Sequence, residues 1–143
     1  MKDVVVPLDR ADDAPRMAAQ AIARYRREPA RIHLVNVQRP LPRHIARHFG
    51  KTDLHDFHRE AGLRELAPLI SSLDEAGVPH EDHVLVGKPA EAIVDFAEHA
   101  NHAEVLLDDT PESVLSMLGL GSVGSQVRRL MTTHGAADAS LSG

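Results

Sequence analysis

The chain has 143 residues, 43% of them hydrophobic and 26% charged, and its formal net charge is −5. Length and composition are typical of one globular domain, and the absence of cysteine excludes disulfides, thiolate chemistry and cysteine-based zinc sites. The acidic balance, with one tyrosine and three phenylalanines, argues against nucleic acid as a partner.

Neither a membrane span nor an export signal is recognisable. No apolar run approaches the ~20 residues that a membrane-spanning helix needs. The first six residues lack the basic and then apolar pattern of a leader. We therefore expect a cytoplasmic protein without a membrane partner.

The first part of the chain alternates between strand and helix patterns. Residues 4–8 are nearly all apolar, as in a strand buried on both faces. Residues 32–37 predict a second strand, which ends before Arg39 and Pro40. Between them, an acidic turn at residues 9–13 leads into a helix with apolar residues at helical spacing: Met17, Ala18, Ala21, Ile22 and Tyr25.

The middle of the chain contains the longest predicted helix. Residues 41–52 are irregular and include one short helical turn. The long helix begins at Asp53, and Gly77 is its expected C-terminal stop. Its buried stripe is predicted from seven apolar positions: Leu54, Phe57, Ala61, Leu66, Leu69, Ile70 and Leu73.

The remainder of the chain repeats the alternation. Residues 84–86 form the core of a third predicted strand, and residues 105–107 form a fourth. Between them, Pro89 lies in the first turn of a helix with apolar positions at Ile93, Val94 and Ala97. A last helix is predicted from Val123, Val127, Leu130 and Met131.

Alternating strands and helices predict an α/β fold, an open, doubly wound parallel sheet of four to five strands with helices on both faces. Residues 135–143 are small and polar and lack the apolar run of a fifth strand. We expect residues 1–134 to form the domain and residues 135–143 to form a disordered tail.

Three motifs stand at the ends of these predicted strands and helices. They are Val4-Val5-Val6-Pro7-Leu8-Asp9, Val86-Gly87-Lys88-Pro89-Ala90-Glu91-Ala92-Ile93 and Leu120-Gly121-Ser122-Val123. In this order and spacing they resemble the universal stress protein family, and the resemblance covers residues 3–134.

The resemblance implies a five-stranded parallel sheet with ligand at the carboxyl ends of the strands, where open α/β sheets form their crevice. It implies that Asp9 approaches the ribose of a nucleotide and that backbone near Val37 meets the adenine. Residues at the start of the last helix would receive the phosphates: Gly121, Ser122 and Val123.

The phosphate side of this pocket departs from the family. Its nucleotide-binding members carry the motif Gly-x2-Gly-x9-Gly-Ser/Thr, but here the first two glycine positions fall on Asp109 and Glu112. The interval to Gly121 is also one residue short. Two like charges ~4 Å apart cost about 1 kcal/mol in water, whereas a helix N-terminus contributes only about 0.3–1 kcal/mol per charge. Together with Asp108, these carboxylates would oppose a triphosphate.

We therefore predict a binding or regulatory module of the stress response, not an enzyme, with a degenerate nucleotide pocket, no catalytic residues and no required cofactor. The alternative is an ATP-binding member with slow hydrolysis, in which Asp108 or Asp109 acts through Mg²⁺. Two plainer interpretations stay open: the Gly121-Ser122 turn as a helix cap, and Asp9 as the start of the next helical turn.

The chain has ten histidines, and two pairs have the spacing of a helical metal site. His44 and His48 are four apart, and His55 and His58 are three apart, so each pair could chelate a transition metal. No His-Glu-x-x-His pattern accompanies them. We interpret these histidines as solvated surface residues and predict no metal site.

The partner of this chain is a second open question. In relatives the fifth strand commonly pairs across a two-fold axis, and this chain lacks that apolar run. We expect a homodimer formed by another route, and an unidentified protein partner.

Overall fold

The computed structural model describes residues 1–107, 127, 130 and 131. Its strands are β1 (Asp3–Pro7), β2 (Arg31–Gln38), β3 (His80–Val86) and β4 (Glu104–Val105). Its helices are η1 (Ala11–Asp13), α1 (Ala14–Arg27), α2 (Arg43–Ala46), α3 (Lys51–Glu75) and α4 (Pro89–His99). The four strands form one sheet in the order β3-β2-β1-β4, and every pairing is parallel. The predicted open, parallel α/β fold is confirmed.

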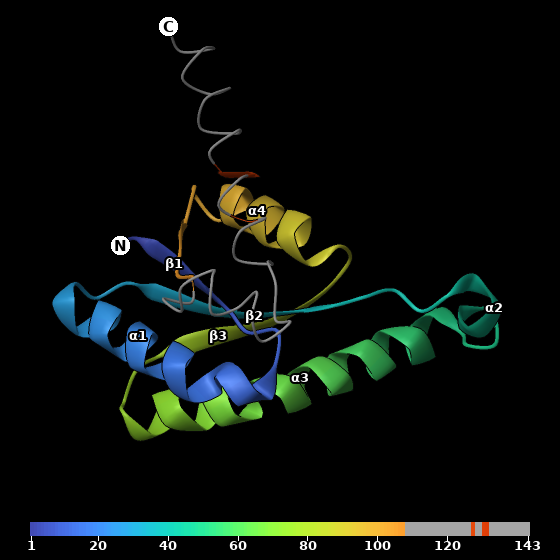
Figure 1. Ribbon diagram of the computed structural model, residues 1–143, viewed down its shortest axis with the longest axis horizontal. Helices are drawn as coiled ribbons and strands as arrows, with labels where there is room; N and C mark the ends of the chain where they lie inside the picture. Colours follow the sequence, from blue (N-terminus) through green and yellow to red (C-terminus); the bar gives the residue numbers. More distant parts are fainter. Residues whose placement is uncertain (108–126, 128–129, 132–143) are drawn as a thin grey trace, which may run out of the picture.

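Helices cover both faces of the sheet, as a doubly wound fold requires (Figure 1). Side chains alternate along a strand, so β1 contributes to two separate cores. Val4 and Val6 pack with residues of α1 and α3, while Val5 packs on the opposite face with residues of α4. All three valines are fully buried, because β1 lies in the middle of the sheet.

The long helix α3 packs on the sheet from about its midpoint, at Gly62, to its C-terminal end. Leu66, Leu69 and Leu73 are fully buried, whereas the N-terminal half extends past the sheet toward α2 (Figure 1). A helix of 25 residues is about 37 Å long, and a strand of eight residues spans about 26 Å. The prediction that Phe57 is buried is wrong, since 44% of it is exposed, whereas the next residue, His58, is 4% exposed and takes the inner face of the helix.

The end of α3 confirms Gly77 as its stop. Gly77 has φ of 72°, a left-handed conformation that glycine adopts without strain. Its N–H donates to the carbonyl of Asp74 at 3.1 Å, and the N–H of Val78 donates to that of Leu73 at 2.9 Å. This pair of hydrogen bonds is the Schellman motif, which turns the chain sharply toward β3. Within the described part of the chain, no helix combines the length and hydropathy needed to cross a membrane.

Gly62 allows α3 to lie close to the sheet. A Cβ at this position would lie 2.5 and 2.7 Å from the two methyl groups of Val84 and 3.1 Å from Oδ1 of Asn36. Because valine is branched at Cβ, its methyl groups cannot rotate away easily. We expect Gly62→Ala to lower the free energy of unfolding by about 1–3 kcal/mol through overpacking, offset by up to ~1 kcal/mol of helix propensity. Urea denaturation measures the change.

A double-mutant cycle with Val84→Ala provides the control for this effect. Val84→Ala alone removes partly buried methyl groups and is expected to destabilise the protein. In the Gly62→Ala background the same change also removes the clash, so its cost should fall or reverse. If the two substitutions add without coupling, the close approach of α3 to β3 is not what requires glycine here.

Candidate functional site

The carboxyl ends of the parallel strands lie at one edge of the sheet, where the chain turns into η1, α2 and α4 (Figure 1). Two predicted site residues are brought to this edge. Asp9 is exposed and follows the end of β1, and Val37 is buried near the end of β2. This is the edge at which open α/β sheets bind ligands.

Buried polar side chains fix the end of β1 at this edge. Asn36 is 1% exposed, and its amide Nδ2 donates a hydrogen bond to the carbonyl of Leu8 at 2.9 Å. Its Oδ1 accepts a hydrogen bond from Nε2 of Gln38 at 2.7 Å. Because an unpaired amide would be costly here, Asn36 holds Leu8 in place. Asp9 is therefore the first residue of the strand–helix connection that is free of the sheet.

The backbone of Val37 faces the space beyond the end of β1. The N–H of Leu8 donates to the carbonyl of Val35 at 2.9 Å, so the backbone groups of Val35 point toward β1. In a strand, alternate residues direct these groups to the same side, so those of Val37 also point that way. The paired register of β1 ends at Pro7 and Val35. Val37 thus presents one donor and one acceptor past the last paired residue of β1.

The first helical turn after β1 already has an anionic partner. Oε2 of Glu65 in α3 accepts a hydrogen bond from the N–H of Ala11 at 2.9 Å. This carboxylate lies at the N-terminus of η1, where a negative charge is favourable. Glu65 therefore occupies a position that a phosphate group would otherwise find attractive.

The predicted phosphate side lies outside the described residues. This applies to Gly121, Ser122 and Val123, to the three carboxylates at residues 108, 109 and 112, and to the predicted tail at residues 135–143. Three apolar residues of the last predicted helix are described. Val127 is fully buried, and Leu130 and Met131 pack partly buried on the face of the sheet that α4 covers.

The histidine pairs singled out by helical spacing do not behave alike. His44, His48 and His55 are exposed, as predicted. His58 is 4% exposed, and within the described residues its Nδ1 has no hydrogen-bond partner. The interpretation of His58 as a solvated residue is wrong, because it shares the inner face of α3 with Gly62 and Leu66, four and eight positions along.

A different group of histidines was missed by the sequence interpretation. Among the residues that the structure describes, His33, Glu81 and His83 are the one group of three whose ligand atoms lie within 4.8 Å of one another. Glu81 and His83 are two apart, which places both on one face of a strand. This strand spacing is visible in the sequence, whereas the predicted histidine pairs rest on the helical spacings of three and four.

The neighbouring His80 has a structural role on the other face of β3. Its Nε2 lies 2.8 Å from Oδ1 of Asp74, and its Nδ1 lies 2.6 Å from Oδ1 of Asp82. Burial lowers the pKa of His80, but the hydrogen bonds with the two carboxylates outweigh burial and raise it above its usual value. The resulting ion pairs connect the end of α3 to β3.

The fold is an open, doubly wound α/β domain in which the carboxyl ends of the parallel strands lie at one edge of the sheet. This is the arrangement of the class of nucleotide-binding α/β domains. The family model of the universal stress protein family matches residues 1–133. The chain belongs to the universal stress protein family, as its three motifs predicted.

Individual relatives agree with this assignment. A universal stress protein of Thermus aquaticus is 32% identical over 126 residues, which cover 87% of this chain and 82% of that protein. The universal stress protein of Archaeoglobus fulgidus in complex with dAMP superposes with a TM-score of 0.59 at 22% identity, over 89% of each chain. A universal stress protein in complex with cAMP gives a TM-score of 0.58 at 23% identity, over 90% of this chain and 88% of that one. At these identities the two structures show the shared fold.

Proposed function

We propose that this protein is a regulatory module of the stress response that recognises the nucleoside part of an adenine nucleotide and disfavours the triphosphate. The observation that carries the proposal is the presence of Asp109 and Glu112 at the two positions where nucleotide-binding members of the family have glycine. The relatives in complex with dAMP and cAMP support adenine nucleotides as the ligand class.

The described half of the pocket supports recognition of adenine and ribose. The backbone of Val37 offers a donor and an acceptor beyond the end of β1, which matches the hydrogen-bonding edge of a purine. The carboxylate of Asp9 is exposed at the same edge and can accept hydrogen bonds from ribose hydroxyls. Neither contact depends on the number of phosphates.

We propose that the discrimination between ATP and nucleotides with fewer phosphates arises on the phosphate side of the pocket, at Asp109 and Glu112. Each carboxylate that comes within ~4 Å of a phosphate charge opposes binding by about 1 kcal/mol in water and by more at lower dielectric. ATP carries more negative charge than AMP or adenosine, so the same two carboxylates penalise it more. We further propose that the protein binds the nucleotide without hydrolysing it. It would then act through a partner protein in the cytoplasm, which is a regulatory role.

The proposal predicts the order of affinities measured by isothermal titration calorimetry. Without Mg²⁺, ATP should bind at least about tenfold more weakly than AMP or adenosine, since about 1.4 kcal/mol of added repulsion corresponds to that factor. Binding of ATP without Mg²⁺ as tight as that of AMP would overturn the proposal. A gain in ATP affinity on adding Mg²⁺, with release of phosphate, would instead favour metal-assisted hydrolysis.

Two neighbouring aspartates provide a matched pair of variants for the nucleoside contact. Asp9→Asn removes the carboxylate at the end of β1, and we expect AMP to bind about tenfold more weakly, in the range of a hydrogen bond to a charged group. Asp12→Asn removes the same charge three residues later, where the side chain is 84% exposed. AMP affinity should be unchanged in that control.

A further inference from the structure

A cluster of three potential metal ligands lies away from the nucleotide edge. His33 is the third residue of β2, and its Cα partner in β3 is Glu81. His83 lies two residues further along β3, on the same side of the sheet. Because β2 and β3 are parallel, this cluster lies toward their amino ends, whereas Val37 lies at the carboxyl end of β2.

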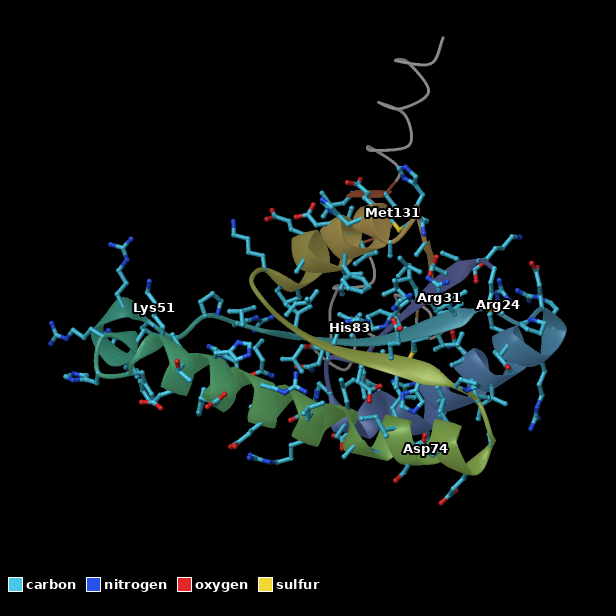
Figure 2. All side chains as sticks on the ribbon, turned by 180° about the vertical axis from the view of Figure 1, so that it is seen from behind. Arg24, Arg31, Lys51, Asp74, His83 and Met131 are labelled. Atoms are coloured by element: carbon cyan, nitrogen blue, oxygen red, sulfur yellow. The ribbon has the colours of Figure 1, made fainter. Side chains whose placement is uncertain are left out.

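The side chains of this cluster face α4. The ring of Phe96 in α4 lies 4.7 Å from the ring of His83 and 5.6 Å from that of His33, measured between centroids. Figure 2 shows His83 on the sheet and the labelled Asp74 on α3, which covers the opposite face. The cluster thus lies against an apolar wall on one side, and Glu81, whose side chain is 59% exposed, opens it to solvent on the other.

A buried carboxylate fixes the orientation of His33. The side chains of Asp3 and His33 are 4% and 7% exposed, and Nε2 of His33 lies 2.9 Å from Oδ1 of Asp3. Nδ2 of Asn101 donates to the other oxygen of Asp3, Oδ2, at 3.3 Å, and the guanidinium of Arg31 lies 3.6 Å from Oδ1. A carboxylate only accepts hydrogen bonds, so Nε2 of His33 carries the proton that faces Asp3, and in the neutral imidazole the lone pair is then on Nδ1.

The lone pair on Nδ1 points at two further ligand atoms. Nδ1 of His33 lies 3.0 Å from Nε2 of His83 and 3.3 Å from Oε2 of Glu81, and these last two atoms are 3.9 Å apart. In a neutral pair, the N–H of His83 can donate to Nδ1. The carboxylate of Glu81 has no proton to share, so its approach to the same lone pair is repulsive. A metal ion bound by all three atoms would remove this repulsion, as would a proton on Nδ1, and titration with metal distinguishes the two.

The three distances match the edges of a tetrahedral metal site. Zinc lies ~2.0–2.1 Å from histidine nitrogen and carboxylate oxygen, which for ideal tetrahedral angles separates neighbouring ligand atoms by about 3.3 Å. The observed separations of 3.0, 3.3 and 3.9 Å lie around this value. A histidine that donates its other ring proton to a carboxylate is the usual outer-shell arrangement of such sites.

We propose that His33, Glu81 and His83 bind a divalent transition-metal ion of the zinc class, with Asp3 as the positioning residue and a fourth coordination position left open. Two imidazoles and one carboxylate are ligands that zinc accepts together. The exposed carboxylate of Glu81 gives the ion a route of entry. The site joins the edge strand β3 to β2 and is independent of nucleotide binding at the carboxyl edge.

Calorimetric titration of the tag-free protein with Zn²⁺ tests the proposal. We expect about one ion per chain. Co²⁺ used as a second probe should give the strong visible absorption of a low-symmetry, four-coordinate site rather than the weak absorption of the hydrated ion. Absence of a stoichiometric site for either ion would overturn the proposal.

Three variants separate this site from nonspecific binding to histidines. Glu81→Gln and His83→Gln change exposed or half-buried side chains, so the fold should persist, and circular dichroism verifies it. His83→Gln should weaken Zn²⁺ binding by at least about 100-fold, because loss of a ligand exceeds the 10–100-fold effect of an outer-shell partner. Asp3→Asn should weaken it by about 10–100-fold and shift the Co²⁺ spectrum.

The matched control removes two histidines from the exposed pair identified by helical spacing. His44→Gln with His48→Gln lowers the histidine count by two but leaves the cluster intact, so Zn²⁺ affinity and stoichiometry should not change. Loss of the stoichiometric site in this control, with retention in His83→Gln, would place the metal elsewhere and overturn the proposal.

Discussion

Leu66→Ala is expected to lower the free energy of unfolding by about 2–5 kcal/mol, the range found for buried leucines replaced by alanine. Leu66 is fully buried and belongs to the core that α1 and α3 form against the sheet. Its removal takes apolar surface out of that core and leaves a cavity that rigid strands on one side cannot fill. Urea denaturation followed by circular dichroism measures the loss.

Phe57→Ala in the same helix is the control. Phenylalanine is larger than leucine, but Phe57 is 44% exposed and its nearest aromatic neighbours are Phe49 and His58. We expect its replacement to change the free energy of unfolding by only about 0.5 kcal/mol. An effect as large as that of Leu66→Ala would mean that another surface covers the N-terminal half of α3.

The same two residues show what periodicity can and cannot predict for α3. The apolar stripe at Leu66, Leu69 and Leu73 is confirmed, because a helix on a sheet buries one face. Over the first half of the helix, the pattern selected Phe57 rather than His58. The inner face there is occupied by a histidine and by Gly62, and hydrophobicity alone does not identify either as buried.

The strands were predictable where both of their faces are apolar. β1 is fully buried from Val4 to Val6, so its sequence has the continuous run that a central parallel strand needs. In β3 only residues 84–86 were predicted, whereas the strand begins at His80. It is an edge strand, and its first half carries charged residues on alternate faces. The metal-ligand cluster was missed for this reason.

The nucleotide edge could be predicted only through the family motifs. Nothing in the local sequence around Val37 distinguishes it from other strand valines, because its proposed contacts use the backbone. The backbone groups of Val37 lie past the end of β1 because the pairing of β1 with β2 ends at Pro7 and Val35. Strand register of this kind is a property of the assembled sheet.

Neutralising the two carboxylates at the glycine positions is expected to strengthen ATP binding without Mg²⁺. The variant Asp109→Asn with Glu112→Gln removes two repulsive contacts of about 1 kcal/mol each, which corresponds to a roughly 30-fold gain in affinity. Adenosine carries no phosphate, so its affinity should not change. Calorimetric titration of both ligands into the wild type and the variant gives the comparison.

A matched control separates local repulsion from the effect of net charge. Glu75→Gln with Asp95→Asn also removes two negative charges, from exposed positions in the second halves of α3 and α4. Charges more than a Debye length from the ligand, ~8 Å at physiological salt, are largely screened, so this variant should bind ATP like the wild type. If instead Asp109→Asn with Glu112→Gln weakens binding of Mg²⁺-ATP, the carboxylates hold the metal, and the pocket is specialised for the triphosphate instead of opposed to it.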